Sequence, residues 1–330
     1  MELIKSKTKI SIFVSSAGRR IELIECLRRS GAILGLNIRI IAGDHRPSLS
    51  AACKIADVAV QLPRCSAPEF IPRLLEVCLA NRVDLLIPTI DTELPVLAKN
   101  RDQFAKAGVT LILSETGVIE IARDKEMTSR VLAAFGVNTP ITVSGDGFRN
   151  GDLSGVEKLI IKPRGGSSSV GIVTPRSREE ALLALSNDST AIVQEFWVGA
   201  EYTVNLFFDS GGQLRCAIPH RRIETRAGEV SKGRTEDVDV LRGAARKVAA
   251  ALPGARGPIC FQAIIRSSGE YAVFEINARF GGGYPLAHQA GATFTHWLLE
   301  EAAGMPCSAS DAWRAGVTML RYDAAVFTED

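Results

Sequence analysis

VFEINARFGGG, at residues 273–283, reads as a buried strand interrupted by polar side chains. Glu275, Asn277 and Arg279 stand at every second position, so their side chains share one face of the strand. Carboxylate and amide oxygens suit Mg²⁺, and a neighbouring guanidinium can stabilise charge on a transferring phosphoryl group. The three glycines that follow let the backbone pass close to a ligand. An exposed polar sheet face is the alternative, but it conflicts with the apolar neighbours that we expect to be buried: Val273, Phe274 and Ile276.

A second strand precedes this one, and a turn at SSGE joins the two within residues 259–280. A hairpin centred on that turn pairs Gln262 with Glu275. Gln262, Glu275 and Asn277 then form one cluster of hard oxygen donors. The cluster predicts a Mg²⁺ site whose shell is completed by phosphate oxygens.

A glycine- and serine-rich loop lies in KPRGGSSSVGI, residues 162–172. Lys162 ends an apolar strand there and adds a point charge. Successive backbone N–H groups of such a loop can turn toward an anion, which predicts phosphate binding. A solvent-exposed hairpin turn is the alternative. The loop residues that we expect to meet the anion are Gly165, Gly166, Ser167, Ser168, Ser169 and Gly171.

The segment AIVQEFWVGAEYTVNLFF, residues 191–208, consists of two apolar strands joined through aromatic residues and a glycine. An aromatic connection of this kind can hold a purine ring while backbone groups read its edge. Glu201 stands where it can bind a ribose hydroxyl. A strand edge with surface acids is the alternative. The residues expected around the base are Gln194, Glu195, Phe196 and Trp197.

Upstream of these motifs, short apolar strands alternate with amphipathic helices. We predict strands at residues 8–16, 37–44, 83–91 and 109–114, with helices at 17–35, 68–82 and 93–108. This alternation is typical of a parallel, doubly wound sheet, in which ligands bind at the carboxyl ends of the strands. The segment SSAGRR lacks the glycine fingerprint of dinucleotide-binding proteins, so a role in substrate binding or a plain turn is favoured. Candidate substrate residues in these loops are Ser16, Arg19, Asp91 and Glu93.

The pattern changes after residue 115. A helical stretch at residues 115–136 ends at Gly136, and short strands and turns follow. We therefore expect two domains, at residues 1–115 and 116–330. The second is expected to contain a small lid at about 140–195 and a catalytic subdomain at about 196–330.

A polar, cationic segment at residues 220–235 lies between two of the predicted catalytic strands. A substrate or phosphate loop and a solvated surface hairpin are both compatible with it. His288 is a second candidate neighbour of the substrate, although a structural role is favoured. The tentative substrate residues in this half of the chain are Arg222, Arg226, Lys232 and Gly282.

Composition restricts the partners and the compartment. The formal net charge is +2, which gives no argument for nucleic acid or an anionic membrane as a partner. Seven cysteines are scattered without a C-x-x-C pair, so reduced thiols and a cytoplasmic protein are expected. A homodimer is the default for such a protein.

Together, five motifs resemble the ATP-grasp superfamily: DK at 124–125, IKP at 161–163, GGSSSVG at 165–171, QEFWVGAEYTV at 194–204 and FEINARFGGG at 274–283. Within it, the chain is most similar to stand-alone proteins related to one ATP-binding half of the carbamoyl-phosphate synthase large subunit. LIPTIDTELPVLA, residues 86–98, resembles the domain that precedes that half. The resemblance implies a Rossmann-like parallel-sheet domain followed by an ATP-grasp fold, with an α+β lid and an antiparallel-sheet catalytic domain.

The resemblance also implies an ATP-dependent carboxylate–amine ligase. A small carboxylic acid, such as an amino acid, would attack the γ-phosphate to give an acyl phosphate and ADP, and an amine would then displace phosphate. Lys125 and Lys162 would contact the phosphates, with Lys162 also near adenine. The metal set of Gln262, Glu275 and Asn277 would hold one or two Mg²⁺ ions, with Mn²⁺ as an alternative. The residues with implied catalytic roles are Arg279, Lys162 and Asn277.

Two other functions stay open on the sequence. One is phosphorylation of bicarbonate or of a carboxylate, as in carbamoyl-phosphate synthesis. The other is a nucleotide-binding regulatory protein without turnover. The second is disfavoured because a decayed enzyme is expected to have lost one of the two lysines, the metal set or Arg279.

Overall fold

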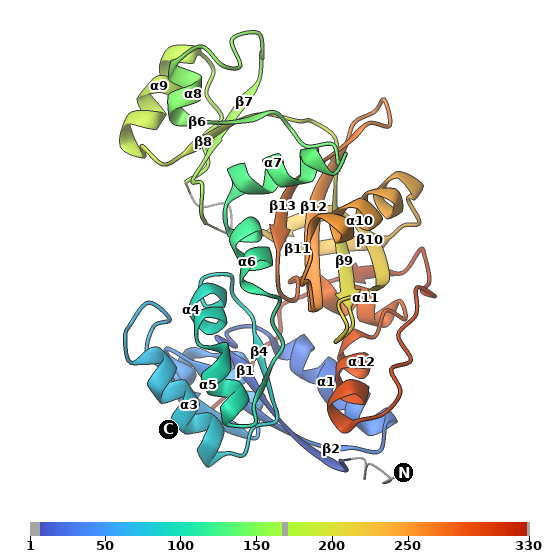
Figure 1. The fold of residues 1–330 in the computed structure, drawn as a ribbon. Coiled ribbons are helices and arrows are strands. Elements are labelled where there is room, and N and C mark those ends of the chain that lie inside the picture. The colour runs from blue at the N-terminus through green and yellow to red at the C-terminus, as the bar shows by residue number, and fades with distance from the viewer. Residues whose placement is uncertain (1–6, 167–170, 329–330) are drawn as a thin grey trace.

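The computed structural model describes residues 7–166 and 171–328 and contains three sheets (Figure 1). Ser167, Ser168 and Ser169, which we predicted in the phosphate loop, lie outside the described residues. A parallel sheet comes first and two antiparallel sheets follow, so the predicted fold class is confirmed. No helix in the described ranges is both long and apolar enough to cross a bilayer.

The N-terminal sheet has five parallel strands in the order β3-β2-β1-β4-β5. Its strands are β1 (Lys9–Ser15), β2 (Asn37–Asp44), β3 (Val58–Gln61), β4 (Leu85–Pro88) and β5 (Thr110–Leu111). Its helical segments are α1 (Ile21–Ile33), η1 (Pro47–Leu49), α2 (Ala51–Ile55), α3 (Phe70–Ala80), α4 (Leu94–Lys99) and α5 (Arg101–Lys106). Along β1, Phe13 belongs to one hydrophobic core and its neighbours Ile12 and Val14 belong to another, so both faces of the sheet are covered.

Three details of this region differ from the sequence prediction. β3 and α2 were not predicted, because a four-residue edge strand of alternating exposure gives a weak periodic signal. The helix predicted at residues 93–108 breaks at Asn100 into α4 and α5. The stretch at 115–136 breaks at Asp124 into α6 (Thr116–Arg123) and α7 (Lys125–Ala134), because the carboxylate of Asp124 caps α7 by accepting the N–H groups of Glu126 and Met127.

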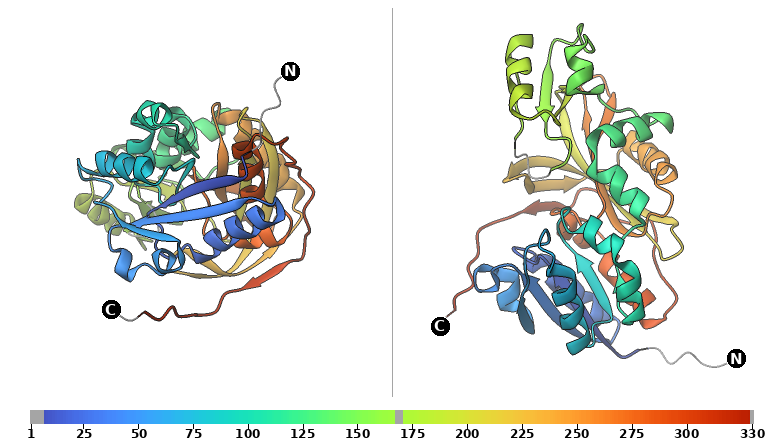
Figure 2. Two further views of the ribbon diagram at one scale, coloured as in Figure 1. Left: turned by 90° about the horizontal axis from the view of Figure 1, so that it is seen from below. Right: turned by 60° about the vertical axis from the view of Figure 1, so that its left-hand side comes forward.

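The lid is a three-stranded antiparallel sheet in the order β6-β8-β7, seen at the top of Figure 1 and in the right view of Figure 2. It has its own small core, which includes Phe148, Leu185 and Val193. Its elements are β6 (Thr142–Ser144), α8 (Gly145–Arg149), β7 (Leu159–Lys162), α9 (Arg178–Asn187) and β8 (Ile192–Glu195).

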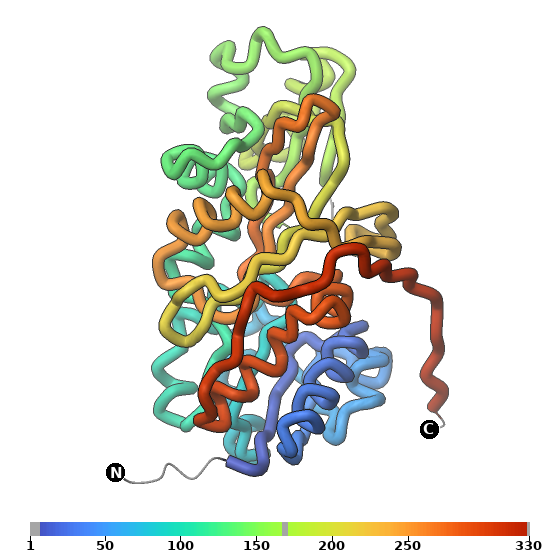
Figure 3. The backbone as a smooth tube through the Cα atoms, turned by 90° about the vertical axis from the view of Figure 1, so that its right-hand side faces the viewer, coloured from blue at the N-terminus to red at the C-terminus, as the bar shows by residue number. Residues whose placement is uncertain are grey.

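The third sheet lies in the predicted catalytic subdomain and is called the catalytic sheet below; it has six strands in the order β13-β12-β9-β10-β11-β14. Its strands are β9 (Ala200–Phe208), β10 (Leu214–Arg226), β11 (Glu229–Thr235), β12 (Gly257–Ile265), β13 (Tyr271–Asn277) and β14 (Thr318–Leu320). Its helices are α10 (Asp239–Ala251), α11 (Tyr284–Gln289) and α12 (Phe294–Ala303). After β14 the chain continues as an extended segment along the side of the molecule (Figure 3).

The two large cores join the N-terminal sheet to the catalytic sheet. Leu206 of β9 lies in the same core as Phe13, while Phe207 lies in the core that contains Ile12. The boundary that we predicted near residue 115 falls between β5 and α6, and it stays a prediction because the packing crosses it. The shared cores hold the loops after β1 and β4 against the end of β13.

Candidate active site

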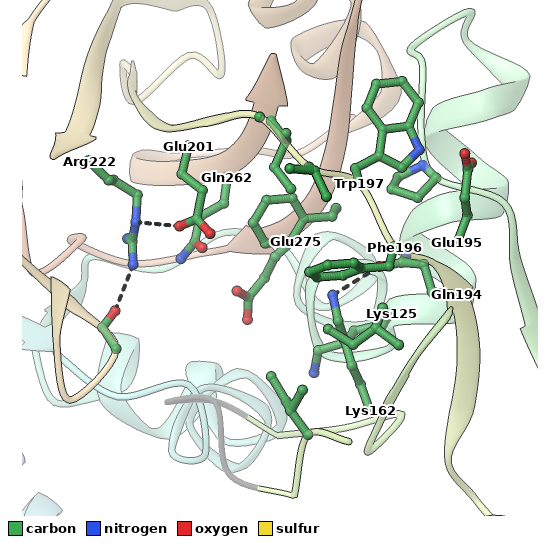
Figure 4. Close-up of a pocket in the computed structure, with 18 of the residues that line it drawn as sticks. Lys125, Lys162, Gln194, Glu195, Phe196, Trp197, Glu201, Arg222, Gln262 and Glu275 are labelled. Carbon is green, nitrogen blue, oxygen red and sulfur yellow. Dashed lines mark hydrogen bonds and ion pairs between the residues drawn. The ribbon is translucent and has the colours of Figure 1, made fainter. Parts of the chain in front are cut away.

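Two adjoining cavities share one wall. The first, of about 620 Å³, lies between the lid and the catalytic sheet (Figure 4). The second, of about 140 Å³, lies between the catalytic sheet and the loops of the N-terminal sheet. The residues that line both cavities are Arg222, Gly228, Gln262 and Glu275.

A β-bulge shapes the shared wall. Gln262 pairs with Glu275, as we predicted, but Ala263 pairs with Val273, so Phe274 is an extra residue in β13. The bulge places two consecutive side chains, Phe274 and Glu275, on the wall of the first cavity. Phe274 was expected to be buried in the core. It faces the cavity instead, because the strict alternation of β13 is interrupted beside it.

Glu275 is a half-buried carboxylate at the junction of the cavities. Burial raises its pKa, and Lys125 and Lys162 oppose that shift. Among the described residues, no side chain forms an ion pair with its carboxylate within 4.0 Å. In Figure 4 the carboxylate points into the cavity on the side where the two lysines end. A partly desolvated anion in this position is suited to a cation brought in with a ligand.

The two lysines approach the same region from the lid and from α7. The amine of Lys162 donates to Oε1 of Gln194 at 2.9 Å and lies 4.9 Å from the centre of the Phe274 ring. Burial lowers the pKa of Lys162 to about 8. The amine of Lys125 donates to the carbonyl oxygens of Gly166 and Pro163, and burial lowers its pKa as well. Both lysines therefore carry a desolvation cost that phosphate oxygens would relieve.

The far end of the first cavity is apolar. Ile160, Phe196, Trp197 and Ile264 contribute to its lining. The side chain of Gln194 is bound on both sides, because its Nε2 also donates to Oγ1 of Thr142 at 2.7 Å. Gln194 therefore positions Lys162.

Two acids that we expected around the nucleotide have arginine partners. The carboxylate of Glu195 accepts a hydrogen bond from Arg266 at 2.7 Å and points away from Glu275 in Figure 4. Glu195 lines the first cavity, and its contact with the base stays a prediction. Glu201 lines the cavity and lies 3.3 Å from Nε of Arg222.

The second cavity is lined by arginines. Nη2 of Arg279 donates to Asp91 at 2.8 Å and to Oδ1 of Asn277 at 3.0 Å. The side chains of Arg279 and Asp91 are only 13% and 8% exposed. This buried ion pair joins the end of the catalytic strand to the loop after β4. Asn277 lines the second cavity only, so of the predicted metal ligands just Gln262 and Glu275 reach the first.

Three predicted residues of the N-terminal loops lie outside both cavities. Glu93 is completely buried and accepts hydrogen bonds from the hydroxyls of Ser15 and Ser16 and from the N–H of Thr89. Glu93 and Ser16 therefore tie the loops after β1 and β4 together. Arg19 is exposed, and its neighbour Arg20 lines the second cavity instead, 2.9 Å from Glu229.

The segment at residues 220–235 forms most of the β10–β11 hairpin, so it is not a loop. Only Arg222 of its three candidates reaches the cavities, because Arg226 pairs with Asp323 and Lys232 with Glu224 on the surface.

The glycines that we predicted around the site have different places. Gly282 lines the second cavity, and a Cβ there would lie 2.7 Å from the carboxyl carbon of Glu229. Gly166 lines the first cavity with a φ of 144°, which favours glycine. Gly165 lies next to Arg123, and Gly171 next to Pro163.

Sequence reasoning missed several residues of the second cavity: Arg20, Thr203, Glu229 and Cys260. Glu229 belongs to the charged hairpin that we had marked, at the start of β11. Arg321, which donates to the carbonyl oxygen of Gly282 and lies 3.5 Å from Glu229, gave no signal because it follows the last short strand.

Comparison with known families explains this arrangement. Residues 12–112 match the family described as "PylC-like, N-terminal domain", and residues 122–283 match the family described as "ATP-grasp domain". The chain contains an ATP-grasp domain. ATP-grasp enzymes are ATP-dependent ligases that form C–N bonds, so the predicted enzyme class is confirmed.

Solved structures share the fold of this ATP-grasp protein at low identity. Biotin carboxylase from Campylobacter jejuni superposes with a TM-score of 0.73 at 15% identity, over 90% of this chain and 71% of that one. N5-carboxyaminoimidazole synthetase from Staphylococcus aureus gives 0.69 at 14%, over 95% and 82%. L-amino acid ligase from Bacillus licheniformis gives 0.67 at 17%, over 90% and 75%. A search of curated proteins gave no match.

Proposed function

We propose that this chain is an ATP- and Mg²⁺-dependent carboxylate–amine ligase that activates a small carboxylic acid as an acyl phosphate. The wall shared by the two cavities carries the proposal. Gln262 and Glu275 line both cavities, so a nucleotide in the first and an acid in the second would meet at these side chains.

The first cavity has the properties that ATP requires. Its volume of about 620 Å³ lies within the usual range of ligand sites, and its apolar end suits a base. Lys125 and Lys162 lie toward Glu275, where the phosphates would end. Related structures support a nucleotide here: the Staphylococcus aureus synthetase was solved with ADP, and a biotin carboxylase domain from Hydrogenobacter thermophilus with MgADP and bicarbonate.

The oxygen donors fit Mg²⁺ that arrives with a nucleotide. Within the described ranges, no group of three or more His, Cys, Asp and Glu side chains could hold a metal alone. One carboxylate, Glu275, with the amide of Gln262 matches the usual Mg²⁺ site, in which phosphates and water complete the shell. When bound, Mg²⁺ would neutralise charge that develops on the transferring phosphoryl group. Mn²⁺, a homodimer and a cytoplasmic location stay predictions.

In the second cavity, Arg279 would hold the acid so that a carboxylate oxygen faces the γ-phosphorus. That oxygen forms the new P–O bond as the bond from phosphorus to ADP breaks. The amine then attacks the acyl carbon, phosphate leaves, and the amine proton passes to solvent. Such chemistry relies on positioning and charge neutralisation rather than on side-chain proton transfer, which agrees with an arginine-rich site.

Bicarbonate is the second candidate for the activated acid, and the size of the second cavity favours it. A volume of about 140 Å³ equals the share of about five water molecules in the liquid. A site of that size fits bicarbonate or the carboxylate end of a small organic acid.

The proposal is tested by ADP and phosphate release from Mg-ATP against a panel of amino acids, small carboxylic acids and bicarbonate, with hydroxylamine as the trap. We expect release that depends on one acid, with a hydroxamate formed when the acid is organic. Turnover with bicarbonate alone would favour the second candidate. ATP binding without turnover on any acid would favour a regulatory protein, and the absence of ATP binding would contradict the proposal.

The affinity for ATP is expected to fall as the pH rises above about 8. Below that pH the amine of Lys162 is already protonated, but above it the free protein must take up a proton to meet the phosphates. Above that pH, the Kd for ATP should rise by a factor that approaches about ten per pH unit. The rise should stop at the pKa that Lys162 has in the ATP-bound protein. Calorimetry from pH 7 to 10 measures it. Lys162→Arg keeps its charge over this range and should flatten the curve, and an unchanged slope in that variant would contradict the assignment.

A further inference from the structure

Arg266 connects the tip of the β12–β13 hairpin to the chain that leaves the lid. Its Nη2 donates to Oε1 of Glu195 at 2.7 Å, and its guanidinium carbon lies 3.6 Å from the centre of the Trp197 ring. The side chains of Arg266 and Glu195 are 34% and 21% exposed, so the contact is partly desolvated. A charge-assisted hydrogen bond and a cation–π contact thus meet on one guanidinium.

The contacted segment, residues 195–199, consists of the last residue of β8 in the lid and the connection to β9 of the catalytic sheet. Its far end is fixed by close packing, because a Cβ on Gly199 would lie 2.2 Å from the carbonyl oxygen of Ile265. Its near end is held by Arg266. All five of its residues line the first cavity. The shape of the cavity at this end therefore depends on how the segment is held.

We propose that Arg266 is a positioning residue for the nucleotide, acting through Glu195 and Trp197. It holds the connection at residues 195–199 in the conformation that forms the base end of the first cavity. The same hairpin carries Gln262 and Glu275, so Arg266 also ties the base end to the strands that form the shared wall. This inference rests on the proposed function and assigns to Glu195 a role other than direct contact with adenine.

Calorimetry with ATP tests the inference without any acid substrate. Arg266→Ala is expected to raise the Kd for ATP about tenfold, equal to about 1.4 kcal/mol. Arg266→Lys keeps the charge but loses the planar stack, so an intermediate Kd is expected. At saturating ATP, kcat and the KM for the acid should stay within about twofold of wild type. Glu270→Gln is the matched control, because Glu270 is exposed and lies 3.9 Å from the same guanidinium.

A double-mutant cycle decides how Glu195 acts. If its carboxylate works only through Arg266, Glu195→Gln weakens ATP binding in the wild type but adds no further loss to Arg266→Ala. An equal loss in both backgrounds would mean that Glu195 meets the nucleotide itself, and the inference would be wrong. Wild-type affinity in Arg266→Ala would overturn it too. Failure of the wild type to bind ATP would instead overturn the proposed function and the inference with it.

Discussion

Glu275→Gln is expected to lower kcat by at least about a thousandfold while the protein stays folded. The substitution keeps the shape of the side chain but removes the carboxylate from the shared wall, where it faces Lys125 and Lys162. If Glu275 holds Mg²⁺, the loss removes several kcal/mol of charge stabilisation from the transition state, and each 1.4 kcal/mol is a factor of ten. Steady-state ADP release at saturating ATP and acid measures the effect.

The controls separate a metal ligand from a charged wall residue. Glu224→Gln removes an exposed carboxylate that pairs with Lys232, and it should leave kcat unchanged. Raising the Mg²⁺ concentration should restore part of the activity of Glu275→Gln, because the remaining donors bind the ion more weakly. Activity near that of the wild type in Glu275→Gln at low Mg²⁺ would contradict the role of this carboxylate.

Arg279→Ala is expected to damage both stability and turnover. Removing one partner of the buried pair leaves Asp91 uncompensated, at a cost of roughly 3 kcal/mol and roughly 5 °C in the thermal midpoint. Losing a guanidinium aimed at developing charge should lower kcat about a hundredfold or more. Differential scanning fluorimetry and the ADP-release assay measure the two effects.

The double variant Asp91→Ala with Arg279→Ala distinguishes structure from catalysis. It leaves no unpaired charge, so its thermal midpoint should lie above that of Arg279→Ala. Its kcat should remain as low as that of Arg279→Ala, since the guanidinium is still missing. Recovery of turnover together with stability would show that Arg279 serves only to pair with Asp91.

The repeating patterns of the sequence were enough to predict the sheets and one face of the site. The period of two along β13 and just beyond it placed Glu275, Asn277 and Arg279 together, and the SSGE turn set the pairing of Glu275 with Gln262. The bulge at Phe274 was not predictable. The alternation of polar and apolar residues in the sequence beside an extra residue does not show that the residue is there. Two helix breaks were missed for a similar reason, since Asn100 and Asp124 stand in otherwise continuous helical patterns.

Side-chain partners depend on contacts between distant segments, and sequence spacing does not supply them. Arg19 and Arg20 are adjacent, and only the direction in which α1 begins decides that Arg20 reaches Glu229. Glu93 stands in a candidate ligand loop, yet its carboxylate accepts hydrogen bonds from the hydroxyls of Ser15 and Ser16 in the loop after β1. Glu195 likewise belongs to a nucleotide motif, but Arg266 from another hairpin determines where its carboxylate points.

The most direct test of the account follows heavy oxygen from the acid to phosphate. The organic acid that supports turnover would be labelled with ¹⁸O in its carboxylate, and the products would be analysed by mass spectrometry after one round of ligation. If the carboxylate attacks the γ-phosphorus, the released phosphate carries one labelled oxygen and ADP carries none. Unlabelled phosphate, or label in a released AMP, would contradict acyl-phosphate formation at the wall shared by the two cavities.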